Sequence, residues 1–245
     1  MKVDERSIRI ISSAQAADVA DKVNSLKHLW VRRSELKLHT LGAAAYLDAP
    51  TAETRQQFEI EDYDSERYQA GVKRFNPLLW SNFEWLYHCL RDTLEDFLGG
   101  DCIFLAEKAL PGFHVFEHHE YLSNWRNQIP HFDRQYECLH WPFQMSTFST
   151  EHISFTLPVK LPRTGGGLLL WETELRDMLC NDKQIAKRIA KQASREEISY
   201  EVGKLFIHSG HRLHQISPWK SNPGDQRITM QGHALFHEGE WIVYW

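Results

Sequence analysis

The C-terminal part of this 245-residue chain is a succession of short apolar or alternating runs separated by Gly, Pro and Asn. Such runs predict β-strands, because successive side chains of a strand point to opposite faces. The strands that we expect span residues 103–106, 112–117, 152–161, 167–172, 203–208, 228–236 and 241–245. Many short strands with turn residues between them are typical of a sandwich or a jelly roll. We therefore predict a mainly β chain.

The N-terminal part has a different pattern, with helical spacing of its apolar residues. Ser12 and Gln15 form a capping box, and the apolar positions from Ala16 to Trp30 fall on one helical face. Short strands are expected on either side of this helix, over residues 8–11 and 36–42.

A second helix is predicted to begin at Asn76-Pro77, since Asn favours the cap and Pro the first helical position, and to end at Gly99-Gly100. Its aromatic stripe indicates core packing. We expect both helices to lie on the outer face of one sheet.

We expect residues 1–245 to form a single domain, which is within the usual size for one core. Residues 1–100 would supply helical support, and residues 101–245 the β core with a helical insertion near 174–194. The polar stretch over residues 48–66 is predicted to be a long surface loop and is a candidate lid.

Composition and charge exclude several classes of protein. The formal net charge is −5 and no dense Lys/Arg tract is present, which disfavours nucleic acid or an anionic membrane as a partner. No apolar run is long enough to cross a bilayer, and the first residues lack the apolar core of a signal peptide. Unpatterned spacing of Cys89, Cys102, Cys138 and Cys180 indicates reduced thiols. We therefore expect a cytoplasmic protein, either a monomer or a homodimer.

The chemistry-bearing residues begin with His131 and Asp133, two positions apart. In an extended segment this spacing places both side chains on one face, where they can bind one metal ion. A second imidazole follows at His214, and Arg227 and Thr229 share one face of the next predicted strand.

Strand periodicity alone leaves His208 and His211 open as alternatives to His214, because Ser209-Gly210 indicates a turn or bulge between them.

His-x-Asp, a distant His and a nearby Arg, in this order, resemble the Fe(II)/2-oxoglutarate-dependent dioxygenase superfamily. In that family the distal His commonly stands in a His-x-(Val/Ile)-x-Pro setting, and His214-Gln-Ile-Ser-Pro218 matches it. The resemblance implies a double-stranded β-helix (jelly-roll, cupin-like) core, with Fe(II) bound by His131, Asp133 and His214. It also implies 2-oxoglutarate as co-substrate, held by Arg227 with Thr229, and dioxygen as oxidant.

The donor set agrees with this resemblance. Two imidazoles and one carboxylate on one face of an octahedron leave three positions open, which suits non-haem Fe(II). A planar guanidinium at Arg227 can bind a carboxylate through two parallel hydrogen bonds. In the related halogenating enzymes a Gly or Ala stands at the position of Asp133, so the carboxylate here implies hydroxylation.

For the substrate, the sequence offers Glu117 and Arg74. If Glu117 faces the mouth of the barrel it could bind an ammonium group, and Arg74 could bind a carboxylate. Together they would suit a small free amino acid, and the overall plan resembles the small free-amino-acid hydroxylase and halogenase branch of the superfamily.

Two alternatives stay open. A protein or peptide hydroxylase of the same superfamily is one, because the loop over residues 48–66 could shape an open groove. The other is a non-catalytic, cupin-like metal-binding module. Arg227 distinguishes an oxygenase from the metal-binding module, since a module that only binds metal has no need of a guanidinium near its third ligand.

Overall fold

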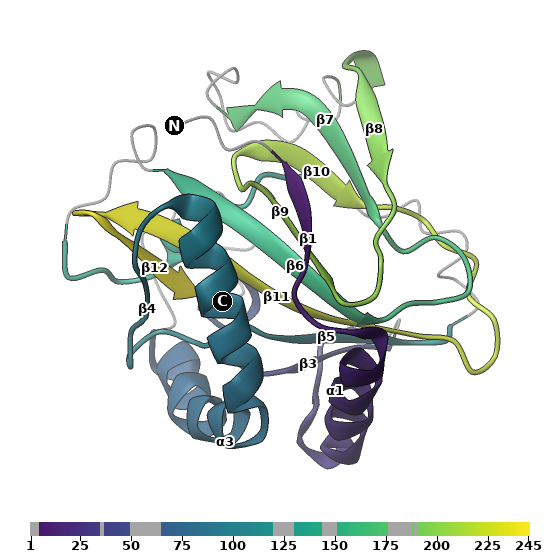
Figure 1. The fold of residues 1–245 in the computed structure, drawn as a ribbon, viewed down its shortest axis with the longest axis horizontal. Helices are drawn as coiled ribbons and strands as arrows, with labels where there is room; N and C mark the ends of the chain where they lie inside the picture. Colours follow the sequence, from purple (N-terminus) through teal and green to yellow (C-terminus); the bar gives the residue numbers. More distant parts are fainter. Residues whose placement is uncertain are drawn as a thin grey trace.

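The structure is a computed structural model that describes residues 5–34, 37–49, 65–119, 130–143, 151–175, 188 and 191–245. Two β-sheets face one another, with α1 and α3 on the outer side of the larger one (Figure 1). The larger, nine-stranded sheet has the order β1-β9-β6-β11-β5-β3-β2, and β12 pairs with β11 and β4. The smaller sheet has the order β10-β7-β8. The chain is therefore mainly β with flanking helices, as predicted.

The strands of the larger sheet are β1 (Arg6–Arg9), β2 (Val31–Arg32), β3 (Leu38–Leu41), β4 (Cys102–Phe104), β5 (Gly112–Glu117), β6 (His152–Lys160), β9 (Lys204–Ser209), β11 (Gln226–His237) and β12 (Glu240–Tyr244). Those of the smaller sheet are β7 (Leu168–Glu174), β8 (Arg195–Ile198) and β10 (Arg212–Ile216). The helices are α1 (Ser13–Ser25), η1 (Lys27–Leu29), α2 (Ala45–Asp48), α3 (Ser65–Leu98) and η3 (Gln135–Cys138).

Helix α1 begins as its sequence predicts. The Gln15 backbone N–H donates to Ser12 Oγ at 3.2 Å, and the Ser12 N–H donates to Gln15 Oε1 at 2.9 Å. Val19 and Val23 are buried against the sheet. The helix ends at Ser25, so Trp30 follows η1 and does not belong to the helical face that we predicted.

The predicted start of the second helix is wrong. Helix α3 begins at Ser65 and continues through Pro77, and its backbone leaves helical angles only at Phe83 (φ −135°, ψ 20°). Asn76 does not cap the helix, because its side chain bonds the loop before β5: Nδ2 donates to the Lys108 carbonyl at 2.8 Å, and Oδ1 accepts from the Leu110 N–H at 3.0 Å. The predicted apolar stripe is buried as expected.

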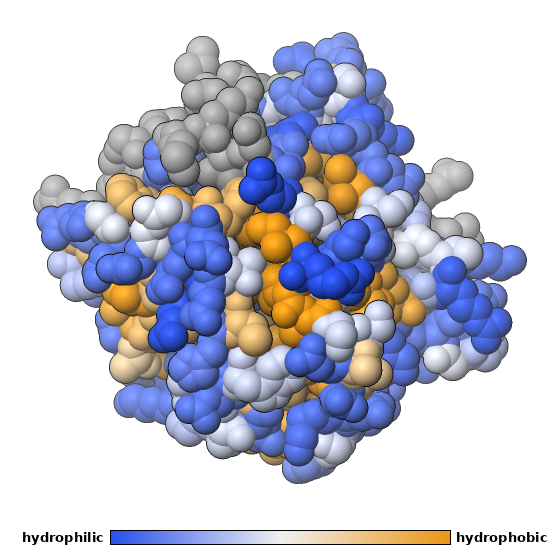
Figure 2. All heavy atoms as spheres, in the orientation of Figure 1, coloured by the Kyte–Doolittle hydropathy of each residue, from blue (hydrophilic) through white to orange (hydrophobic). Residues whose placement is uncertain are grey.

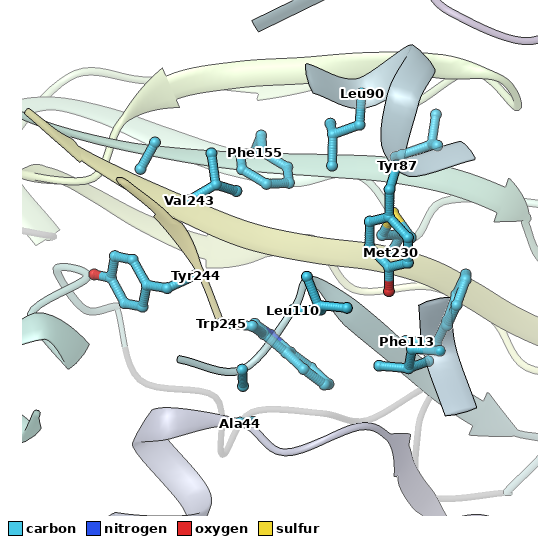
Figure 3. Close-up of a cluster of buried hydrophobic side chains, with 14 of the residues drawn as sticks. Ala44, Tyr87, Leu90, Leu110, Phe113, Phe155, Met230, Val243, Tyr244 and Trp245 are labelled. Carbon is cyan, nitrogen blue, oxygen red and sulfur yellow. The ribbon is translucent and has the colours of Figure 1, made fainter. Parts of the chain in front are cut away.

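The main hydrophobic core lies between the helices and the outer face of the larger sheet. Figure 3 shows Tyr87 and Leu90 of α3 beside Phe155, Met230 and Phe113 of three neighbouring strands. On the surface of the same side, apolar side chains are visible between α3 and α1, while hydrophilic side chains cover the helices themselves (Figure 2). This core fixes the sheet whose opposite face carries the polar residues described below.

Two of the predicted segments, the loop over 48–66 and the helical insertion near 174–194, lie mostly outside the described residues. Cys180 lies outside them as well. In the ranges that the structure describes, α3 is the longest helix, and neither it nor any shorter one has the sustained apolar run that a bilayer crossing requires.

Candidate metal centre

Backbone hydrogen bonds bring the two predicted halves of the site together. The His131 N–H donates to the His214 carbonyl at 2.9 Å, and the His214 N–H donates to the His131 carbonyl at 3.0 Å. The Asp133 N–H donates to the Gly210 carbonyl at 2.8 Å, in the turn between β9 and β10. The His-x-Asp segment is therefore fixed in register against β10.

The side chains of His131, Asp133 and His214 converge. One nitrogen or oxygen atom of each lies within 4.8 Å of the others, which is a spacing that one metal ion can bridge. His214 Nε2 is 3.2 Å from Asp133 Oδ2, and His131 Nε2 is 3.9 Å from Asp133 Oδ1. The Asp133 and His214 side chains are 7% exposed, whereas that of His131 is 50% exposed. His131 therefore marks the open side of the group.

His208 and His211, the alternatives for the third position, are not part of this group among the described residues. His211 Nε2 bonds the Tyr136 hydroxyl at 2.8 Å. His208 is buried beside His214, with 4.8 Å between the ring centroids, and its Nδ1 bonds the Ser209 carbonyl at 2.8 Å. The geometry thus favours His214.

Neighbouring groups orient the candidate ligands. His214 Nδ1 is 2.8 Å from the Arg212 carbonyl, so Nδ1 carries a proton, and Nε2, which faces Asp133, is the atom that can bind a metal. Asp133 accepts from Gln135 Nε2 at 2.8 Å through Oδ1 and from Ser154 Oγ at 2.6 Å through Oδ2.

The electrostatics of the group resemble an ion pair. Burial would raise the pKa of Asp133, but the neighbouring His214, His233 and His131 hold that pKa well below its usual value. Burial would lower the pKa of His214, but Asp133 reverses the effect, so the pKa of His214 is raised. A divalent cation placed between these groups would replace the proton that His214 holds.

Arg227 lies on β11 and is 1% exposed. Its Nε donates to the Gly166 carbonyl at 2.9 Å, and its Nη1 donates to Thr229 Oγ1 at 3.2 Å. Its Nη2 is buried with no hydrogen-bond partner among the described residues. Burial lowers the pKa of Arg227 to about 10, which still leaves it charged at neutral pH.

The surroundings of Arg227 exclude the simpler interpretation, a surface ion pair with Asp225. Asp225 instead faces Arg163 at 3.5 Å, and the Arg227 guanidinium carbon lies 5.8–6.0 Å from the ring centroids of Phe116, Tyr200 and Trp219. A buried cation with an unpaired N–H donor is costly unless an anion binds it. This position is therefore a candidate carboxylate site.

The two predicted substrate residues do not join this site. Glu117 alternates with Val115 and Phe113 on the helix-facing side of β5, where it pairs with Lys27 and lines an open surface pocket. The prediction that Glu117 could face the barrel mouth is wrong, because the inward positions of β5 are His114 and Phe116. Arg74 lies on the exposed side of α3, with its guanidinium over the Phe75 ring.

The sequence interpretation missed Ser154 and His233, which approach Asp133 from the larger sheet. A signal for them existed in the alternation of β6, where His152, Ser154 and Thr156 occupy one face and apolar residues the other. Polar residues at every second position of a buried strand indicate a polar interior.

The comparisons with known proteins agree with this geometry. No family model matches the sequence, and no curated protein matches it. Among solved structures, an N-substituted L-amino acid dioxygenase from Burkholderia ambifaria, in complex with α-ketoglutarate, matches with a TM-score of 0.56 and 13% identity over 98% of this chain and 86% of that chain.

Two Streptomyces proteins match with a TM-score of 0.50. AviO1 from Streptomyces viridochromogenes is 11% identical over 97% of this chain and 91% of that chain. HygX from Streptomyces hygroscopicus, with nickel and 2-oxoglutarate bound, is 8% identical over 95% of this chain and 83% of that chain. These likenesses show the fold alone: the chain has the jelly-roll fold that these solved structures share.

Proposed function

We propose that this protein is an Fe(II)- and 2-oxoglutarate-dependent oxygenase that hydroxylates an unactivated C–H bond of a small molecule, with release of succinate and CO2. His131, Asp133 and His214 would bind the iron, and Arg227 with Thr229 would bind the far carboxylate of 2-oxoglutarate. The observation that carries the proposal is Arg227 Nη2, a buried and unpaired donor on a guanidinium that has no structural ion pair among the described residues.

The residues present fit both groups. Two imidazoles and one carboxylate are the donors that leave open positions on a non-haem iron. Strand alternation places Arg227 and Thr229 on the inner face of β11, which is also the face of His233 near Asp133. Iron with 2-oxoglutarate and dioxygen would supply the oxidation of the C–H bond.

The protein's own residues would have three tasks. Arg227 would orient the keto acid through two N–H donors, and the Thr229 hydroxyl, which already accepts from Nη1, could donate its own proton to the same carboxylate. The Arg212 carbonyl would keep His214 in the tautomer that binds metal. The exposed His131 would leave one side of the group open to substrate.

For the substrate, we propose a free or N-substituted amino acid or a similar small molecule. Since Glu117 and Arg74 lie away from the site, this part rests on the likeness to the Burkholderia ambifaria dioxygenase. A metal-binding module without turnover would leave the buried charge of Arg227 without a purpose.

The test is an anaerobic titration of metal-free protein with Fe(II) and then 2-oxoglutarate, followed by the weak visible charge-transfer band of a chelated keto acid. We expect the band in the wild type and none in His131→Ala. Arg227→Ala should need about 100-fold more keto acid, because two hydrogen bonds to a charged group contribute about 3 kcal/mol.

The matched control is Arg163→Ala, which removes an arginine whose side chain is 75% exposed, and it should bind the keto acid like the wild type. Fe(II) binding without any band would contradict the proposal and favour a metal module or an oxygenase that uses no keto acid. Succinate formation with a panel of free and N-substituted amino acids then tests the substrate class.

A further inference from the structure

Asp133 is tied to the larger sheet by a chain of two hydrogen bonds. Ser154 Oγ lies 2.6 Å from Asp133 Oδ2 and 2.9 Å from His233 Nδ1. All three residues are buried. Ser154 and His233 are direct cross-strand partners on β6 and β11, so they project from the same face of two central strands.

The direction of both bonds follows from counting protons. An ionised carboxylate can only accept, so the single hydroxyl proton of Ser154 goes to Asp133 Oδ2. Ser154 Oγ must then accept from His233, which therefore carries its proton on Nδ1. The order of donation is His233 to Ser154 to Asp133.

This chain of hydrogen bonds adds a link between the segment that carries Asp133 and the larger sheet. The backbone around His131 and Asp133 is bonded to His214 of β10 and to the turn at Gly210. Ser154 and His233 belong instead to the middle of the larger sheet, which the helices hold from behind. The Ser154 bond thus fixes the carboxylate relative to the sheet that also carries Arg227.

Gly210 makes room for this arrangement. A Cβ atom at Gly210 would lie 2.1 Å from His152 Nδ1 and 2.9 Å from Ser154 Oγ, closer than packed atoms approach. The turn can therefore come near enough for its carbonyl to bond the Asp133 N–H while Ser154 keeps its own bond.

We propose that Ser154 and His233 are positioning residues for the metal centre: they orient the Asp133 carboxylate so that it is preorganised to bind a divalent cation. The inference rests on the proposed function and extends it to residues outside the candidate ligand set. Hydrogen-bond partners of ligating groups typically contribute a factor of 10–100 to metal affinity.

The experiment is a titration of metal-free protein with Co(II), which needs neither 2-oxoglutarate nor substrate, followed by the visible absorption of the bound ion. Ser154→Ala should raise the Kd for Co(II) by about 10–100-fold and change the shape of the spectrum, because Asp133 Oδ2 loses its hydrogen-bond donor and only Gln135 still bonds Oδ1. The matched control, Ser217→Ala, removes another fully buried serine hydroxyl, one without a hydrogen-bond partner among the described residues, and should leave both unchanged.

A second pair of variants separates positioning from packing. His233→Leu removes the Nδ1 donor, whereas His233→Asn places an amide N–H donor near the same point. We expect weaker Co(II) binding in His233→Leu and recovery of the affinity and the spectrum in His233→Asn, measured on variants whose circular dichroism matches the wild type.

Equal Co(II) affinity and spectra in the wild type, Ser154→Ala and His233→Leu would overturn this inference and leave the proposed function standing. Equal weakening in His233→Leu and His233→Asn would also overturn it, since packing alone would then explain the effect. Wild-type protein that binds no Co(II) would overturn the proposed function, and this inference with it.

Discussion

The two faces of the nine-stranded sheet bury different chemistry. On β6, Phe155 and its outward neighbours pack against α1 and α3 in the main core. The inward positions of the same strand, such as Ser154, are polar and face the smaller sheet. The outer face stabilises the fold by removing apolar surface from water. The inner face contributes less to the stability of the fold, because each of its buried polar groups needs a hydrogen-bond partner or a ligand.

This difference between the two faces is clearest in the buried histidines. His114, His152 and His208 lie inside with Arg227, in a region where an apolar core would be more stable. Proteins commonly bury destabilising polar or charged groups of this kind at functional sites. The two faces should therefore respond differently to acid and to substitution.

The largest expected effect is acid sensitivity that originates on the inner face. Burial lowers the pKa of His114 and His208 to about 3 and the pKa of His152 well below its usual value. These groups stay neutral in the folded protein while the unfolded chain takes up protons below about pH 6.5. Stability is therefore lost as pH falls through that value, by up to about 4 kcal/mol per pH unit for three protons.

Urea unfolding of the metal-free protein between pH 7.5 and pH 5 measures this slope. His114→Gln should reduce it by about one proton, or ~1.4 kcal/mol per pH unit. His28→Gln, at an exposed position, should leave it unchanged. A free energy of unfolding that stays constant across this range would contradict the assignment of neutral, buried histidines.

The next largest effect concerns the outer face. Phe155→Ala should reduce the free energy of unfolding by about 3–5 kcal/mol, because it leaves a cavity under α3. The Kd for Co(II) should change less than twofold in protein that remains folded.

The control for Phe155 is Phe236→Ala on β11, since Phe236 is 37% exposed and its loss should cost less than about 1 kcal/mol. If the free energy of Co(II) binding fell in Phe155→Ala by as much as the free energy of unfolding, metal binding on the inner face would depend on packing at the outer face.

A smaller effect, of opposite sign for stability and for binding, is expected at Arg227. Arg227→Met replaces a buried cation by an apolar side chain of similar length, which should leave stability unchanged or raise it by about 1–4 kcal/mol. Affinity for 2-oxoglutarate should fall about 100-fold. Thermal unfolding together with keto acid titration measures both, and a large loss of stability would indicate a structural role for Arg227.

How much of this could be predicted from the sequence depends on whether a feature is local. The capping box of α1 and the turn at Ser209-Gly210 are set by neighbouring residues, and the structure confirms both. These two features need no knowledge of what packs against them. That His214 would join His131 and Asp133 was expected from the resemblance to the dioxygenase superfamily and not from the spacing, and the three side chains do converge.

The features that sequence reasoning missed depend on distant partners. The bond from Ser154 to Asp133 joins residues 21 positions apart, one on a strand of the larger sheet and one on a segment outside both sheets. Asn76 was assigned as a cap, but its side chain is used by a loop more than thirty residues later. The inner and outer sides of β5 could not be told apart, because nearly all of its residues are buried and the burial pattern carries no alternation.

The smallest effect tests that last point, the direction in which Glu117 faces. Glu117 is on the outer side of β5 in an ion pair with Lys27, whose side chain is 60% exposed. Glu117→Gln should therefore change the free energy of unfolding by less than about 1 kcal/mol, because solvent screens such pairs. Co(II) and 2-oxoglutarate titrations should match the wild type, and so should succinate formation with any substrate found. Lys27→Gln should behave like Glu117→Gln, since each removes one partner of the same surface pair. A loss of substrate turnover in Glu117→Gln alone would mean that the carboxylate reaches the inner face during the reaction, and the separation of the two faces would then fail at β5.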